Sequence, residues 1–187
     1  GVTLHTVPMD GGGTNPLRDL ATRRAMLSEL RSLRPSAVLC YNPKPVAYGP
    51  VAARRAGVAR VGAMVTGLGY AFTGSGLKRR LIRAVAARLY RKAFKACDVV
   101  FFQNRDDLEL FTRLGVVPSV RASGSAAGHA PRIELVAGSG VDLERFAQAP
   151  LPDPPTVHFV MVARLLRDKG AYEFVDAARL VRADAPK

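Results

Sequence analysis

Two cations near the end of the chain have the residue types and the spacing to bind a diphosphate. Arg164 and Lys169 flank a loop that follows the apolar run 157–162 and enters a helical pattern beginning at Ala171. A helix N-terminus presents unpaired backbone N–H groups and favours an anion. An arginine fork and a lysine point charge would add to that preference. The spacing alone leaves open a second interpretation, two solvated charges on a surface loop.

Glycine-rich segments follow two other apolar runs, and both could bring a backbone close to a ligand. The first segment comprises Thr66, Gly67, Leu68, Gly69 and Tyr70. The second runs through Gly138, Gly140 and Asp142. Glycines allow a close approach and expose backbone N–H groups. Tyr70 and Phe72 could stack on a sugar or an isoprenoid chain, or pack in the core. Both segments are equally compatible with ordinary tight turns.

The greatest concentration of charge lies in the predicted helix 77–96. The chain has 28 Lys and Arg against 15 Asp and Glu, a formal net charge of +13, which indicates a polyanionic partner. The helix contains no acidic residue, and its basic residues are Lys78, Arg79, Arg80, Arg83, Arg88, Arg91, Lys92 and Lys95. Its apolar residues form two neighbouring i, i+4 columns, one with Leu81, Val85, Leu89 and Ala93, the other with Ile82, Ala86, Tyr90 and Phe94.

We expect the apolar columns of this helix to pack on a sheet. The basic residues would then contact an anionic membrane surface or a lipid phosphate. The residues expected to make this contact are Lys78, Arg79, Arg80 and Arg83. The alternative is a core-packed helix with a solvated basic face.

The elements that must position these residues alternate along the chain. Apolar runs typical of buried strands occupy residues 2–7, 37–41, 61–65, 98–102, 133–136 and 157–162. Helical patterns lie between them, with Asn15 and Asn104 as predicted N-caps. This alternation predicts an α/β fold, a Rossmann-like parallel sheet with helices on both faces. Ligands of such sheets bind at the carboxyl ends of the strands, where the three candidate loops lie.

Composition excludes several other classes of protein. No run of eighteen uncharged apolar residues is present, so no transmembrane helix is predicted. Cys40 and Cys97 fit no metal-ligand spacing and are predicted to be buried thiols of a cytoplasmic protein. The histidines, His5, His129 and His158, match no catalytic position. No metal site is therefore expected.

Five segments, in order along the chain, resemble family 4 glycosyltransferases. Residues 162–170, Val-Ala-Arg-Leu-Leu-Arg-Asp-Lys-Gly, are similar to the strand, loop and helix that open the C-terminal domain of that family. Residues 138–142, followed by Phe146, resemble the Gly-x-Gly-Val-Asp-x-x-x-Phe segment at the domain junction. Residues 15–20, 41–49 and 65–72 resemble a bacterial branch that extends polyprenyl-diphosphate-linked sugars.

The resemblance implies a GT-B fold, two Rossmann-like domains that face each other across a cleft. Residues 1–146 would form most of the acceptor-side domain, 147–155 the linker, and 156–187 the beginning of the nucleotide-sugar domain. The implied reaction moves a sugar from a nucleotide-diphosphate donor, UDP-linked, to a lipid-linked saccharide, with retention at the anomeric carbon. It requires no metal or other cofactor. The enzyme would act in cell-surface polysaccharide assembly, peripherally on the inner face of the cytoplasmic membrane.

The resemblance also implies roles for the candidate residues. Arg164 and Lys169 would neutralise the leaving diphosphate. The segment from Thr66 to Tyr70 would line the acceptor side of the cleft, and the segment from Gly138 to Asp142 would lie at the domain junction. No catalytic residue is assigned.

The sequence also departs from the family pattern. The Glu-x7-Glu segment that holds the donor sugar is not among the 187 residues, so we expect this chain alone to lack full transferase activity. Two alternatives stay open: a basic nucleic-acid-binding module and a non-catalytic GT-B remnant. No helix-turn-helix signal, zinc spacing or RNA-binding aromatic motif supports the first, so no nucleic-acid partner is expected.

Overall fold

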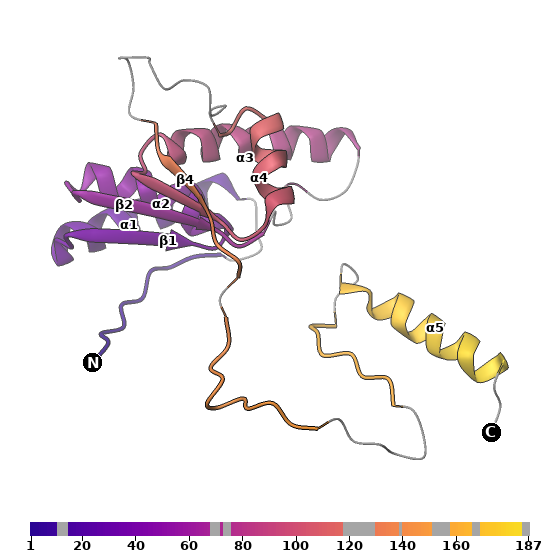
Figure 1. Cartoon of the computed structure of the whole chain (residues 1–187). Helices are drawn as coiled ribbons and strands as arrows, with labels where there is room; N and C mark the ends of the chain where they lie inside the picture. The colour runs from indigo at the N-terminus through magenta and orange to yellow at the C-terminus, as the bar shows by residue number, and fades with distance from the viewer. Residues whose placement is uncertain are drawn as a thin grey trace. The chain divides into compact units, whose positions relative to one another are not determined.

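The computed structural model describes residues 1–10, 15–67, 72, 76–117, 130–138, 140–150, 158–165 and 169–184. These residues belong to two compact units, Gly1–Val141 and Asp142–Lys187. Each unit is described by itself. Figure 1 shows the first unit as a layer of strands with helices packed against it.

The first unit contains a four-stranded parallel sheet. Its strands are β1 (Ala37–Tyr41), β2 (Arg60–Val65), β3 (Val99–Phe102) and β4 (Arg132–Leu135). Their order across the sheet is the same as their order along the chain, β1-β2-β3-β4, and every neighbouring pair is parallel. In one row across the sheet, Cys40 pairs with Ala63, Ala63 with Val100, and Val100 with Ile133. The predicted parallel α/β sheet is confirmed.

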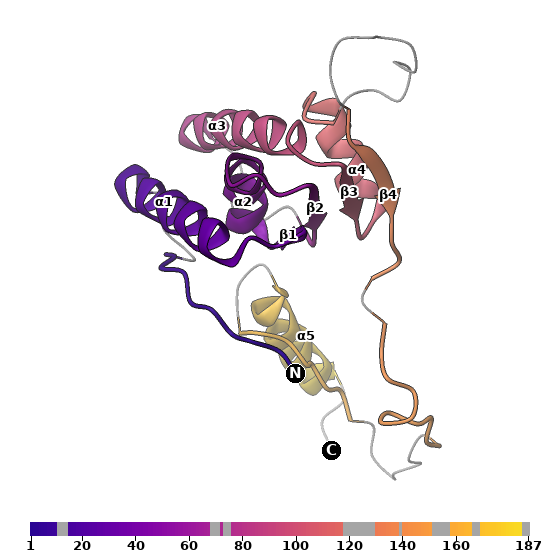
Figure 2. The same cartoon turned by 90° about the vertical axis from the view of Figure 1, so that its left-hand side faces the viewer.

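Helices separate the strands and cover one face of the sheet. They are α1 (Pro16–Leu33), α2 (Pro43–Arg55), α3 (Leu77–Phe94) and α4 (Arg105–Arg113). Right-handed crossovers between consecutive neighbouring strands bring the connecting helices to the same face. Figure 2 shows α1, α2 and α3 on one side of the strands. The ring of Phe111 in α4 contacts that of Phe102 in β3, 5.6 Å between centroids, so α4 covers this face too.

The opposite face is more exposed in the part of the chain that the structure describes. Strand residues alternate between the two faces, and the burial pattern of β1 and β3 follows this alternation. Cys40 and Val100 on the covered face are buried, whereas Leu39 and Tyr41 are 54% and 57% exposed. The described helices of this unit therefore provide one of the two covering layers that the sequence predicted.

Helix boundaries follow the predicted capping signals. The Asn15 side chain accepts hydrogen bonds from the backbone N–H groups of Leu17 and Arg18 at the start of α1. The Asn104 side chain accepts one from the N–H of Asp107 at the start of α4. Helix α2 starts at Pro43. Proline in the first turn lacks only an N–H that would have no intrahelical partner.

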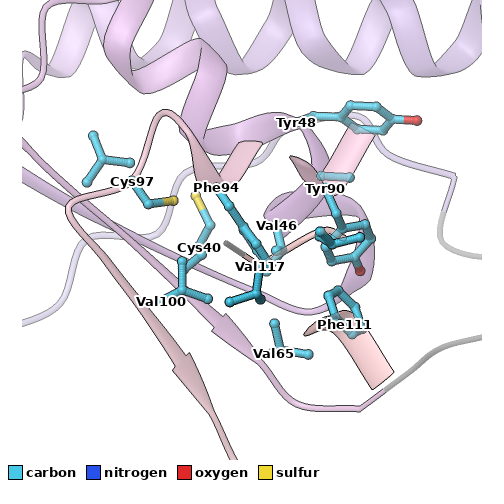
Figure 3. Close-up of a cluster of buried hydrophobic side chains, with 14 of the residues drawn as sticks. Cys40, Val46, Tyr48, Val65, Tyr90, Phe94, Cys97, Val100, Phe111 and Val117 are labelled. Atoms are coloured by element: carbon cyan, nitrogen blue, oxygen red, sulfur yellow. The ribbon is translucent and has the colours of Figure 1, made fainter. Parts of the chain in front are cut away.

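An aromatic cluster forms the centre of the core between the helices and the covered face. The Phe111 ring is fully buried and lies 5.0 Å from the ring of Phe72 and 5.2 Å from that of Tyr90. Phe94 and Phe102 complete the cluster. Figure 3 shows Tyr90, Phe94 and Phe111 beside the buried valines. Phe72 is thus a core residue, which agrees with the second of its two interpretations, packing in the core.

The edge formed by the strand N-termini is held by an ion pair whose two side chains also bind backbone groups. Arg54, near the end of α2, donates to the carbonyls of Ala96 and Ala59 and pairs with Asp98. Asp98 also accepts a hydrogen bond of 2.7 Å from the N–H of Val61. These bonds fix the end of α2 to the starts of β2 and β3.

Two predicted strands are wrong. Residues 2–7 are irregular, and Val2 and Leu4 are about nine-tenths exposed. Residues 158–162 are irregular as well, while residue 157 lies outside the described part. A strand is stabilised by hydrogen bonds to a neighbouring strand, and neither segment has one among the described residues. The helix predicted after residue 170 is present as α5 (Ala171–Asp184).

The close packing of α2 on β1 predicts the effect of one added methyl group. A Cβ at Gly49 would collide with Sγ of the buried Cys40. Gly49→Ala should therefore lower the free energy of unfolding by about 1–3 kcal/mol, as overpacked cores do. In the double variant Cys40→Ala/Gly49→Ala the colliding sulfur is absent, so the effects of the two changes should not add. Urea unfolding of the wild-type chain, the two single variants Cys40→Ala and Gly49→Ala, and the double variant measures this coupling. Simple additivity of the two single effects would contradict the predicted contact.

Candidate functional site

The carboxyl ends of all four strands meet at one edge of the sheet. Asn42 follows β1, Thr66 and Gly67 follow β2, and Gln103 follows β3. Since β1, β2 and β3 are neighbours, these residues come together at the position where parallel sheets bind ligands. Thr66 is exposed, and Gly67 has φ 151°, which favours glycine. Leu68, Gly69 and Tyr70 of the same predicted segment lie outside the described residues.

Asn42 has a backbone conformation that is rare for a residue with a side chain. Its φ is 72° and its ψ 154°, and its side chain makes no capping hydrogen bond to α2. Residues held in such sparsely populated regions often lie at ligand sites. The exposed Asn42 therefore places an amide, both donor and acceptor, at the candidate edge.

A half-buried polar cluster holds the segment that contains Asn42. The Asp19 carboxylate in the first turn of α1 accepts a hydrogen bond from Nζ of Lys44 at 2.8 Å and one from the hydroxyl of Tyr48 at 2.9 Å. Side-chain exposure is only 17% for Lys44 and 18% for Asp19. From α3, the Tyr90 hydroxyl donates to the Pro43 carbonyl at 3.3 Å. Helices α1 and α3 thus fix the start of α2 from two sides.

The environment of this cluster alters the acidity of Tyr48. Burial, with a further contribution from the hydrogen bond to Asp19, raises the pKa of Tyr48 to about 12. The guanidinium of Arg23 lies 5.9 Å from the centre of the Tyr48 ring. Sequence reasoning missed this cluster because Asp19 lies 25 residues from Lys44 and 29 from Tyr48 along the chain. Asp19 and Lys44 lie in the first turns of two adjacent helices, with Tyr48 one turn after Lys44, and these positions are the signal that could have found it.

The second glycine segment is a turn at the end of the first unit. Gly138 and Gly140 have φ values of 74° and 72°, in the left-handed region that glycine adopts most readily. The Asp142 carboxylate accepts hydrogen bonds from the backbone N–H groups of Glu144 and Arg145 at 3.0 and 3.1 Å. The division between the two units falls next to it, after Val141. The ordinary-turn interpretation fits these residues, and their role at a domain junction stays a prediction.

The predicted diphosphate-binding cations lie in the second unit. Arg164 and Lys169 are both exposed, and residues 166–168 between them lie outside the described part. Gly170 has φ 77°, and its carbonyl accepts a hydrogen bond from the Phe174 N–H as α5 begins. Lys169 therefore lies directly before the N-terminus of a helix, as the sequence predicted. Its binding of a diphosphate stays a prediction.

The basic residues of α3 differ in exposure. Arg80 is exposed, and Arg79 and Arg83 are half-buried. The side chain of Lys78 is not among the side chains that the structure describes. Arg91 donates to the carbonyls of Gly115 and Leu114 and so caps the end of α4. An open groove of about 580 Å³ runs along the helix. Its lining includes Arg80, Arg83, Arg88, Arg91 and Leu114.

Only part of the apolar surface of α3 packs as expected. Tyr90 and Phe94 are buried, whereas Leu81 and Val85 are 67% and 53% exposed. The expectation that both apolar columns pack on the sheet is therefore wrong for the N-terminal half of the helix. Leu81 and Tyr90 are nine residues apart, and at about 100° per residue they point to opposite sides of a helix. A single sheet cannot bury both.

Other predicted features concern the cysteines and the membrane. Cys40 and Cys97 are buried free thiols, as predicted. Burial raises the pKa of Cys40 to about 11 and that of Cys97 to about 12. Within the described ranges, no helix is both long enough and apolar enough to span a bilayer. The same residues contain no group of three or more His, Cys, Asp or Glu side chains that could hold a metal ion.

The buried phenol of Tyr48 predicts a specific alkaline response. Since its pKa is raised from 10.0 to about 12, its protonated form is favoured in the folded state. The resulting stabilisation is complete below pH about 10 and is lost as the pH rises through about 12. Tyr48→Phe lacks both the proton and the hydrogen bond to Asp19. The wild-type chain should therefore be the more stable at neutral pH, and its advantage should shrink across this alkaline range. Urea unfolding at a series of pH values measures it; a constant difference would refute the assignment.

Comparison with known proteins adds two findings. Residues 1–123 match the glycosyl transferase 4-like domain family. The chain is also similar to the N,N'-diacetylbacillosaminyl-diphospho-undecaprenol alpha-1,3-N-acetylgalactosaminyltransferase of Campylobacter jejuni subsp. jejuni serotype O:2. The two are 25% identical over 150 residues, which cover 74% of this chain and 37% of the Campylobacter protein.

Proposed function

The chain belongs to the glycosyl transferase 4-like family, and we propose that it supplies the acceptor-binding part of a glycosyltransferase. The reaction transfers a sugar from a nucleotide-diphosphate donor to a saccharide linked to a polyprenyl diphosphate. The observation that carries this proposal is the family match over residues 1–123, which include β1, β2, β3 and the segments that follow them.

The Campylobacter relative supports the class of acceptor. Its name describes transfer to a sugar carried on diphospho-undecaprenol. The chain matches about 37% of the length of that relative. Donor, acceptor and stereochemistry are therefore proposals for an enzyme that contains this chain. We assign it a UDP-linked donor and retention at the anomeric carbon, in cell-surface glycan assembly.

The carboxyl edge of the sheet provides the acceptor side of the proposed site. Thr66 is exposed there, and in the described part of the chain no heavy atom lies within 4 Å of a Cβ added at Gly67. The Asn42 amide can donate to one sugar hydroxyl and accept from another. The hydrogen bonds of Asp19 and Tyr90 keep the Asn42 segment in place, so little ordering would be needed on binding.

The second unit provides the proposed donor cations. Negative charge builds up on the departing diphosphate in the transition state, so cations placed there lower the barrier. Arg164 and Lys169 are exposed and can approach such a group. In this proposal the side chains of Arg164 and Lys169 compensate the negative charge of the leaving diphosphate.

The proposed acceptor also places the enzyme at a membrane. A polyprenyl chain stays in the bilayer, so the diphosphate and its sugar are reached at the surface. The basic helix α3 supports a peripheral position on the anionic inner face of the cytoplasmic membrane. In this proposal Lys78, Arg79, Arg80 and Arg83 contact lipid phosphates.

Two glycines test the acceptor edge. Gly67 lies at the carboxyl edge, and Gly57, between α2 and β2, lies at the opposite edge. Both have positive φ, and among the described residues no heavy atom lies within 4 Å of an added Cβ at either, so each Ala variant has a backbone strain of about 1–3 kcal/mol. Gly67→Ala should weaken binding of a soluble, short-chain prenyl-diphosphate N-acetylhexosamine about tenfold, and Gly57→Ala should leave it unchanged. Calorimetric titration measures both. Equal affinities for the two variants, or no binding by the wild-type chain, would contradict the proposed acceptor site.

The donor cations are tested by removing their charges. The double variant Arg164→Gln/Lys169→Gln should weaken UDP binding to the chain at least tenfold, since two charge-assisted contacts to the diphosphate are lost. Arg179→Gln/Arg182→Gln is a matched control, because it removes two positive charges from the helix that follows. NMR titration with UDP measures the affinities. Equal weakening in both double variants would indicate general charge attraction and refute a specific diphosphate site.

A further inference from the structure

The half-buried polar cluster at the start of α2 places a cation at the carboxyl edge of the sheet. Lys44 lies in the first turn of α2, two residues after Asn42, which follows β1. Its side chain is 17% exposed, and its Nζ donates to Oδ1 of Asp19 at 2.8 Å. Helix α1, which carries Asp19, packs beside α2, as Figure 2 shows. The ammonium group of Lys44 is thus held at the edge that we propose for acceptor binding.

The Lys44 ammonium group keeps donors for a ligand. An ammonium group has three N–H donors, and Asp19 is the one side chain that accepts from it in the part of the chain that the structure describes. The other carboxylate oxygen of Asp19, Oδ2, accepts a hydrogen bond of 2.9 Å from the hydroxyl of Tyr48. Two donors therefore share the negative charge of this carboxylate, whereas the ammonium group of Lys44 has one acceptor.

The charges of the cluster leave a positive excess. The guanidinium of Arg23 lies 5.9 Å from the centre of the Tyr48 ring, so the cations Lys44 and Arg23 share one carboxylate, that of Asp19. The first turn of α2 contains no acidic residue. A lysine in that turn opposes the helix dipole and lowers the stability of the helix. Helix stability alone would therefore favour a neutral or acidic residue at position 44, and an anionic ligand accounts better for the positive charge.

A diphosphate is the anion that the proposed acceptor brings to this edge. This step rests on the proposed function, in which the diphosphate is attached to the anomeric carbon of the first sugar. Two residues of chain span at most about 7 Å, which is comparable with the width of one hexose ring. A sugar whose hydroxyl groups bind the Asn42 amide can therefore bring its diphosphate to the side chain of Lys44. An ammonium group is a compact point charge that binds phosphate oxygens.

We propose that Lys44 binds the diphosphate of the lipid-linked acceptor and that Asp19 positions its ammonium group. Asn42 then contacts the first sugar, and Lys44 binds the group that all acceptors of this class share. The donor also has a diphosphate, which the proposed function assigns to Arg164 and Lys169 in the other unit of the chain. Removal of the Lys44 charge should therefore weaken binding of the acceptor and not that of the donor.

Two variants that break the same ion pair distinguish a ligand contact from a purely structural link between helices. Lys44→Gln and Asp19→Asn both remove the pair, so a structural link predicts similar effects on binding. The readout is the ratio of two affinities measured by NMR titration, that of a soluble, short-chain prenyl-diphosphate N-acetylhexosamine to that of the methyl glycoside of the same sugar. Lys44→Gln should lower this ratio about tenfold, because a charge-assisted contact is lost, whereas Asp19→Asn should raise it, because a competing carboxylate is removed. Lys44→Arg keeps the charge and should restore most of the ratio.

Lys95→Gln is the matched control, because Lys95 is an exposed lysine at the end of α3, at the opposite edge of the sheet. It should leave the ratio unchanged, and urea unfolding checks that every variant is folded under the conditions of the titration. An unchanged ratio in Lys44→Gln, or a fall of equal size in Asp19→Asn or in Lys95→Gln, would overturn the proposal. Equal weakening of UDP binding and acceptor binding by Lys44→Gln would overturn the assignment to the acceptor.

Inorganic pyrophosphate, added to the wild-type chain, separates failure of this proposal from failure of the proposed function. The side-chain NMR signals of Lys44 should shift during the titration, and those of Lys95 should not. A chain that binds the prenyl-linked saccharide while the Lys44 signals stay unchanged refutes the role of Lys44 alone. A chain in which Lys44 binds pyrophosphate, but which binds no prenyl-linked saccharide, refutes the proposed function and leaves Lys44 as a diphosphate site.

Discussion

The consecutive order of four parallel strands is the constraint on which the rest of the structure depends. Each strand lies beside the next strand in the chain, so successive right-handed crossovers place α2, α3 and α4 on one face. The same order brings all four carboxyl ends to one edge. The covered face contains the aromatic core around Phe111, and the edge contains the exposed residues Asn42 and Thr66.

The two edges of this sheet are stabilised in different ways. At the amino edge, Arg54 and Asp98 bind backbone groups and each other, which ties the end of one helix to two strands. At the carboxyl edge, the cluster at Asp19 and Lys44 lies behind the Asn42 segment and leaves the amide of Asn42 exposed. A fixed backbone with exposed polar groups is what a preorganised saccharide site requires. The physical division between the edges thus agrees with the family assignment.

Much of this fold could be predicted from local sequence signals, and the failures have a common cause. The caps at Asn15 and Asn104 and the buried β-strands are local features and were predicted correctly. Residues 2–7 and 158–162 have strand-like composition but no neighbouring strand among the described residues, and pairing cannot be read from one segment. The exposure of Leu81 likewise depends on which side of α3 the sheet occupies. Thr66 and Gly67 follow β2 as the sequence predicted, whereas the cluster at Asp19 depends on contacts between distant segments.

The central claim is that the carboxyl edge of the sheet binds the sugar-diphosphate end of the acceptor. The most direct measurement is the mapping of amide chemical shifts of the chain in the presence of a soluble, short-chain prenyl-diphosphate saccharide. The account predicts the largest changes at Asn42, Thr66 and Gly67, at the ends of two adjacent strands. Changes centred instead on Gly57 and Asp98 at the opposite edge would contradict it.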